Sequence, residues 1–350
     1  WTKIVSEDSA YIFNQGEAYY LYDVCLTREN KIIAVGTTTN CNYIGDSLGY
    51  VGSYIVCYDT SGNLQWQWHD CGCGLPVYEN SELFAVAEAE NGDIIAVGYS
   101  NSTKYTISNL GYTTYQGLVV RIDSGGNLIY RKRWGWPECT AGFIDVGILP
   151  GDNIALAGFV GDTLEGCDDF RQLLLITDAD ANPLYQNNFT CGGLLGGGGS
   201  NTQSVAYGGD SCLYNINYTA CIGPPNDLCS EQAIVIKKYN RFGQLLNYKI
   251  IGDTSLSHSS YMAITSHPEG GATVGFTFSK NTPSYHYGAY LIRVDTALNG
   301  DYPQGDFPDM GAIEDEYIVY NSIGEHSNTP IKTYPNPAGD ELYVELPEHC

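Results

Sequence analysis

The sequence predicts an all-β protein, a five-bladed β-propeller, and three observations support this prediction. A small apolar residue followed twelve positions later by glycine or asparagine recurs about every 60 residues. Short runs rich in Ile, Val and Tyr alternate with Gly, Asn and Asp turns, which is typical of buried strands. No segment keeps the 3.6-residue period of an amphipathic helix. Radial stacking is the compact way to bury both faces of five small sheets, and an open array or a β-solenoid is the alternative.

The recurring pair marks the first two strands of each copy. Asn217 stands where the other four copies have glycine. Because Asn is the next residue to tolerate the left-handed region, we expect a positive φ at this position in every copy. Since most of the chain is scaffold, function should be sought where the copies differ. The five pairs are Val24/Gly36, Val86/Gly98, Val146/Gly158, Val205/Asn217 and Ala263/Gly275.

Each copy is expected to hold four strands of about 60 residues in total. The second strand is the most regular, at 32–36, 94–98 and 154–158. A third run, such as 54–58, leads to a turn in which Asp or Asn can accept hydrogen bonds from the backbone two residues on. These turns begin at Asp59, Asp123, Asp178, Asn240 and Asp295.

The two ends of the repeat predict how the ring closes. The fifth copy runs into residues 301–305, where Pro303 cannot donate to a β-ladder. Residues 1–5 are strand-forming and are expected to supply the missing fourth strand, which would remove two open edges. The predicted organisation is therefore a propeller over 1–302, a linker or extended strand over 303–330, and the start of a further β segment over 331–350.

Composition indicates the environment of the protein. Forty acidic against sixteen basic residues give a net charge of −24, which argues against nucleic acid and anionic membranes as partners. No apolar run is long enough to be inserted in a bilayer. Because the first residue is already strand-forming, the chain is expected to be a mature form whose leader was removed.

The twelve cysteines point to an oxidising compartment and to disulfides. Cys221 and Cys229 flank a short loop that a disulfide would pin. Cys25 and Cys57 fall on strands of the first copy and are expected to pair within one blade. The segment 69–73 gathers four residues that could bind a metal, but its spacing does not match a structural zinc site, so no metal or cofactor is expected.

The motifs do not predict an enzyme. Carboxylate pairs of the kind that glycosidases need occur at 168–169 and at Glu314 with Glu316, but in no catalytic motif. The GxSxG match at 45–49 lies between strands, whereas a nucleophile elbow needs a strand-to-helix turn. The glycine-rich run 192–200 lacks the lysine of a phosphate loop. Residues 178–182 imitate half a calcium loop but are explained by a hairpin turn.

Two resemblances suggest an exported protein. The repeat unit resembles propeller repeats of surface proteins from gliding and related Gram-negative bacteria, over residues 1 to about 302. Residues 331–346 resemble the opening of the C-terminal sorting domain that the type IX secretion machinery reads. This second resemblance implies transport across the outer membrane to the cell surface or the medium. Its motif residues are Tyr334, Pro335, Asn336 and Pro337.

The same resemblance implies O-glycosylation at triplets of Asp, Ser or Thr, and an apolar residue. The alternative is chance, because Asp, Ser and Thr are frequent turn residues. The four candidate acceptors are Ser9, Ser47, Thr163 and Thr296.

Two functional hypotheses follow. In the first, the chain is a structural or adhesion protein of the cell surface that self-associates into a fibre or layer when an extended strand of its tail (303–350) adds to a neighbour. In the second, the propeller binds surface glycans without catalysis, because aromatic side chains stack on sugars. The 29 tyrosines motivate the second hypothesis, notably Tyr99, Tyr105, Tyr112 and Tyr115.

Overall fold

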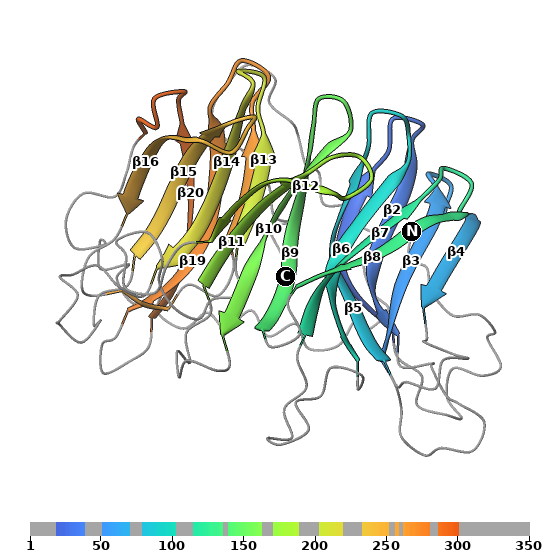
Figure 1. Ribbon diagram of the computed structural model, residues 1–350. Coiled ribbons are helices and arrows are strands. Elements are labelled where there is room, and N and C mark those ends of the chain that lie inside the picture. Colours follow the sequence, from blue (N-terminus) through green and yellow to red (C-terminus); the bar gives the residue numbers. More distant parts are fainter. Residues whose placement is uncertain are drawn as a thin grey trace, which may run out of the picture. The chain divides into compact units, whose positions relative to one another are not determined.

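The computed structural model confirms the all-β class and the four-stranded repeat (Figure 1). It describes residues 19–38, 51–70, 79–102, 115–135, 139–162, 171–188, 203–219, 233–251, 256–258, 262–280 and 286–300. These ranges form five antiparallel sheets, numbered 1 to 5 in chain order, and all belong to the compact unit Trp1–Phe307. Within them, no helix has the length and apolarity that crossing a membrane requires.

The first four sheets are simple meanders, in which each strand pairs with the next one in sequence. Sheet 1 contains β1 (Tyr19–Leu26), β2 (Lys31–Thr38), β3 (Gly52–Asp59) and β4 (Leu64–Asp70). Sheet 2 contains β5 (Glu79–Glu88), β6 (Ile94–Ser102), β7 (Tyr115–Ile122) and β8 (Leu128–Trp134). Sheet 3 contains β9 (Cys139–Leu149), β10 (Asn153–Asp162), β11 (Arg171–Thr177) and β12 (Pro183–Asn188). Sheet 4 contains β13 (Gln203–Tyr207), β14 (Cys212–Thr219), β15 (Ala233–Asn240) and β16 (Leu245–Ile251).

Sheet 5 departs from this order. It contains β17 (Leu256–His258), β18 (Met262–Ser266), β19 (Ala272–Lys280) and β20 (His286–Val294). Both β17 and β18 pair with β19, whose remaining partner is β20. Beyond β20, the described pairing is an isolated bridge between Val294 and Gly300. The predicted fourth strand, residues 1–5, lies outside the described residues.

The predicted Asx turns are present in all five copies. In the first, the Asp59 carboxylate accepts the backbone N–H of Asn63 at 2.8 Å, and the later copies repeat this bond. The fourth turn residue has a positive φ, as glycine allows. Two copies place other residues there, Ala181 with φ 56° and Leu298 with φ 63°. Leu298 is buried in the core, which offsets the backbone strain.

The prediction of a positive φ at the recurring glycine is wrong. Among the described residues with a positive φ, none is the recurring glycine or Asn217. In sheets 1 to 3 the first strand carries a β-bulge opposite this position. A Cβ on Gly98 would lie 1.8 Å from the Glu82 carbonyl oxygen. Glycine is therefore required for close backbone approach, and Asn217 is tolerated because the β13–β14 pairing has no such shift.

Substituting Gly98 by alanine is expected to destabilise the protein by about 3 kcal/mol, since the clash is with backbone and a side-chain rotation cannot relieve it. Gly275→Ala is the matched control, because a Cβ there would meet Leu291 at an ordinary 3.7 Å. Chemical denaturation measures both. Equal losses of unfolding free energy in the two variants would contradict the bulge explanation.

Consecutive sheets pack face to face, as in propeller blades. From sheet 1 to sheet 4 each first strand lies beside the first strand of the next sheet, and β13 of sheet 4 lies beside β18 of sheet 5. Apolar side chains fill the interfaces between sheets 1 and 2, 2 and 3, 3 and 4, and 4 and 5. Alternate residues of the buried second and third strands, such as β2 and β3, face opposite neighbours, so these strands read as nearly continuous apolar runs.

Carboxylates next to two of the bulges join neighbouring sheets. The Asp23 carboxylate accepts the backbone N–H of Val86 in sheet 2 at 2.9 Å. Asp145 in sheet 3 likewise accepts the N–H of Val205 at 2.7 Å and the hydroxyl of Ser204 at 2.6 Å. The Ser204 hydroxyl oxygen accepts the N–H of Ile264 at 3.1 Å. The bonds of Asp145 and Ser204 thus form a polar relay that links sheets 3, 4 and 5.

The prediction of a Cys25–Cys57 disulfide is wrong, because both cysteines are free thiols. Cys25 on β1 and Cys57 on β3 are both register partners of Ile33 on the intervening β2. Two strand spacings separate them by roughly 9.5 Å, whereas a disulfide requires Cα atoms within about 7 Å. Cys221 and Cys229 lie outside the described residues.

Candidate functional site

Each sheet meets the next at a junction where its fourth strand lies against the Asx turn of the following sheet. The third residue of the fourth strand faces this turn in every case, and it is Trp66, Tyr130, Tyr185 or Asn247. The four junctions are thus equivalent sites, and their differences show which one departs from the scaffold.

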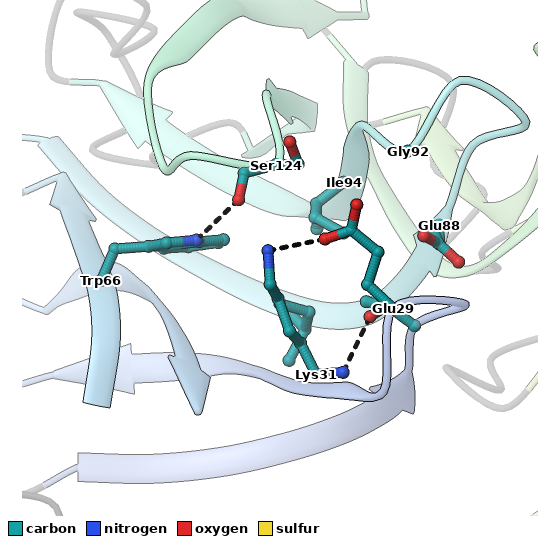
Figure 2. Close-up of a pocket in the computed structure, with 9 residues that line it drawn as sticks. Glu29, Lys31, Trp66, Glu88, Gly92, Ile94 and Ser124 are labelled. Carbon is teal, nitrogen blue, oxygen red and sulfur yellow. Dashed lines mark hydrogen bonds and ion pairs between the residues drawn. The ribbon is translucent and has the colours of Figure 1, made fainter. Parts of the chain in front are cut away.

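The junction between sheets 1 and 2 is almost filled, and Figure 2 shows the side chains that line the small cavity that remains. The Trp66 indole N–H donates to the Ser124 carbonyl oxygen at 3.1 Å. The Lys31 ammonium pairs with Glu29 at 2.8 Å, and the cavity that remains is about 10 Å³.

The junction between sheets 2 and 3 is closed by a buried cation. The Arg121 guanidinium pairs with Asp93 at 2.7 Å and donates to the Ala179 carbonyl oxygen at 2.6 Å. The Tyr130 hydroxyl donates to the same carbonyl at 3.0 Å. A side chain of the third strand therefore spans the gap between the sheets.

The junction between sheets 4 and 5 repeats this arrangement with lysine. Lys238 pairs with Asp210 at 2.8 Å and donates to the Thr296 carbonyl oxygen at 2.6 Å. Asn247 donates to the Ala297 carbonyl at 2.9 Å.

The junction between sheets 3 and 4 is open. In sheet 3, Ile176 occupies the position of Arg121 and Lys238, and Asn153 occupies that of Asp93. An isoleucine cannot reach the next turn, so a surface pocket of about 490 Å³ remains. Its described lining residues are Leu149, Pro150, Asn153, Ile176, Leu184, Tyr185, Arg241 and Phe242.

The pocket presents an aromatic and basic surface. Phe242 is exposed to 61 % and stands at the Asx turn of sheet 4, with the Arg241 guanidinium over its ring at 4.7 Å from the centroid. The Tyr185 ring packs against Gly243, where a Cβ would lie 2.1 Å from a ring atom. Gly243 thus lets the turn approach the tyrosine, and the preceding residue, Phe242, is exposed to solvent. An exposed ring beside a planar cation suits stacking on a sugar or another flat ligand.

A second unusual group lies buried between the same two sheets. Lys237 on β15 is fully buried, and its ammonium donates to the Gln172 side-chain oxygen on β11 at 2.8 Å. Its register partner Asn215 is also buried. Burial lowers the pKa of Lys237 to about 7, because the interior disfavours its charged form.

Few of the sequence-predicted site residues lie in the described ranges. Thr296 is exposed in its turn, and its carbonyl accepts the Lys238 bond. Tyr99 donates to Glu82 at 2.9 Å and its ring packs on Tyr115, so both have structural contacts. The remaining predicted residues lie outside the described ranges: Ser9, Ser47, Thr163, Tyr105, Tyr112, Tyr334, Pro335, Asn336 and Pro337.

The open junction was missed in the sequence although its signal is present. The turn after the third strand carries Arg241 and Phe242 in sheet 4, where the other copies have small or polar residues such as Ser124 and Gly125. A comparison of the five turns, position by position, would have singled out this pair of a basic and an aromatic residue. The third-strand cation is missing both at Ile176 and at the equivalent Cys57 of sheet 1, so this second signal alone would have left two junctions.

Comparison with known proteins yields similarity of structure alone. No family model and no curated protein matches the chain. It is similar to an α-L-arabinofuranosidase from Fusarium graminearum, with a TM-score of 0.44 and 10 % identity over 81 % of this chain and 78 % of the other. It is similar to a GH43 β-1,3-galactosidase, with a TM-score of 0.42 and 12 % identity over 79 % and 91 %. It is also similar to an arabinanase from Bacillus subtilis, with a TM-score of 0.36 and 12 % identity over 79 % and 96 %.

These similarities correct one prediction. The motif search concluded that the chain is not an enzyme, yet the similar structures are glycoside hydrolases.

Proposed function

We propose that the chain is a carbohydrate-binding β-propeller module and that the open junction between sheets 3 and 4 is its binding site. The observation that carries this proposal is the contrast among equivalent junctions. The other three are closed by Trp66, Arg121 or Lys238, and this one leaves a pocket of about 490 Å³ beside an exposed Phe242. A volume of this order is typical of small-molecule sites.

The wider arrangement of the protein is part of the proposal. The five sheets close into a ring, with residues 1–5 added as a further strand to sheet 5, and the protein acts at the cell surface after type IX export. The succession of packed four-stranded sheets supports the ring. Small-angle scattering by residues 1–302 tests it, since a closed disc and an open array differ in radius of gyration. Self-association through the tail stays a prediction, because residues 303–350 lie outside the described ranges.

A glycan array provides the test of the binding site. The wild-type protein should bind a defined set of glycans, and Phe242→Ala should weaken binding about tenfold through loss of the stacking surface. The double variant Ile176→Arg with Asn153→Asp rebuilds the ion pair that closes the junction between sheets 2 and 3. It should therefore fill the pocket and abolish binding.

Leu128→Ala is the matched control, because Leu128 is an exposed apolar residue of sheet 2 away from the pocket. It should bind as the wild type does. Thermal melting confirms that every variant is folded. Undiminished binding by the folded double variant would exclude this junction as the site.

A further inference from the structure

We propose that the ligand of the open junction is an acidic sugar, one that carries a carboxylate or a sulfate group bound by Arg241. This inference rests on the carbohydrate-binding function proposed above and specifies the class of sugar. The evidence is the distribution of charge among the equivalent junctions.

Carboxylates face the cations of the closed junctions. Arg121 meets Asp93 at 2.7 Å and Lys238 meets Asp210 at 2.8 Å. The small cavity between sheets 1 and 2 is lined by Glu29 and Glu88 together with its lysine. In these places the positive charge of the side chain is neutralised by the protein.

The open junction lacks this compensation. Asn153, a neutral residue, stands where sheet 2 has Asp93. Of the described residues that line the pocket, Arg241 is the one charged group, and no ion pair joins it to another described residue. In a chain with a net charge of −24, a site that offers an exposed guanidinium without a carboxylate selects for an anion.

The geometry also indicates a sugar rather than a free anion. The Arg241 guanidinium is held over one face of the Phe242 ring, which orients its planar set of donors beside the aromatic surface. A ring that stacks on Phe242 would place an attached carboxylate or sulfate within reach of two parallel N–H donors. Asn153 and Tyr185 line the same pocket and can bond hydroxyl groups. An acidic sugar uses all of these groups at once.

The test is a glycan array that carries neutral, uronate-containing and sulfated glycans, read with wild type, Arg241→Gln, Arg241→Lys and Phe242→Ala. Wild-type signal should concentrate on acidic glycans and fall as salt is raised from roughly 50 to 500 mM. Arg241→Gln should weaken binding to these glycans about 10- to 100-fold, and Arg241→Lys should retain part of it. Preference for uronate or for sulfated glycans distinguishes the two anionic groups.

The outcomes separate this inference from the proposed function. If wild type prefers neutral glycans and Arg241→Gln binds them unchanged, the acidic specificity is refuted and the carbohydrate site survives. If wild type binds no glycan of any class, both are refuted. Loss of binding in Phe242→Ala together with unchanged binding in Arg241→Gln would also overturn the role of the guanidinium.

Discussion

Replacing Lys237 by methionine is expected to stabilise the protein at neutral pH and to remove a rise in stability of about 3 kcal/mol between pH 7 and roughly 9.5. Lys237 is fully buried between sheets 3 and 4, and burial lowers its pKa to about 7 from a model-peptide value of 10.5. In that interval the unfolded chain binds a proton that the folded chain does not. Unfolding is therefore favoured most at the low end of the interval, and stability rises with pH.

The measurement is the free energy of unfolding of wild type and Lys237→Met by urea denaturation at several pH values. The difference between the two proteins isolates Lys237 from the tyrosines, which titrate at higher pH. At pH 7 the gain is partly offset, because the methionine leaves the Gln172 oxygen without the 2.8 Å bond, at a cost of about 1–2 kcal/mol. If the difference in unfolding free energy between wild type and Lys237→Met did not vary with pH, the prediction that the buried Lys237 amine loses its proton near pH 7 would be contradicted.

Lys238→Met is the matched control for this experiment. Burial opposes the charge of Lys238, but hydrogen bonds to Asp210 and Tyr214 outweigh it and raise the pKa of Lys238. Its stabilising effect is therefore present throughout the interval and is lost only above the ordinary lysine pKa. Lys238→Met should therefore destabilise the protein at pH 7, whereas Lys237→Met should stabilise it.

Asp145→Asn is expected to have two opposing effects at neutral pH, each of about 2–3 kcal/mol. It weakens the relay between sheets 3 and 4, in which the carboxylate accepts from Ser204 and Val205, and it removes a buried charge, so the net change in stability should be smaller than either effect. If the amide oxygen accepts from Ser204 and Val205, the amide nitrogen faces the Val146 N–H, which in the wild type donates to the other carboxylate oxygen at 2.8 Å. The variant should also lose a pH dependence that the wild type has below neutrality.

The sign of that dependence follows from the burial of the carboxylate. Burial raises the pKa of Asp145 to about 6 although its hydrogen bonds act in the other direction. The folded protein thus holds a proton between about pH 4 and 6 that the unfolded chain releases, so stability falls by about 2–3 kcal/mol as pH rises through this interval. Unfolding free energies at pH 4, 5, 6 and 7 measure it.

Asp178→Asn serves as the control with the opposite slope. Burial opposes its charge slightly, but hydrogen bonds from Asn182 and Asp180 lower the pKa of Asp178 in its exposed turn. Its contribution is lost as pH falls. If the unfolding free energies of Asp145→Asn and wild type changed in parallel with pH, the prediction that burial raises the pKa of Asp145 would be contradicted. The summed contribution of Asp145 and Lys237 to the stability of the folded protein is therefore lowest between about pH 6 and 7.

The sequence by itself determined the repeat and the strand order of the first four copies. The Asx turns and the second strands were predictable because hairpin chemistry is local, since Asp59 and its equivalents bond residues only a few positions away. The recurring glycine was found correctly, but its cause was not. The clash that a Cβ at position 98 would make with the Glu82 carbonyl oxygen depends on a bulge in another strand, which no local rule contains.

The tertiary structure alone decided the rest. It separated Cys25 from Cys57 by an intervening strand, and it placed Arg241 and Phe242 at the edge of a pocket. The physical reason is that this pocket forms where no side chain fills the space between two sheets. Ile176 is too short to span the gap that Arg121 and Lys238 close in other junctions. Whether such a gap is filled depends on which side chains of two different sheets come into contact. Those contacts are determined by how the sheets pack, not by which residues are neighbours in the sequence.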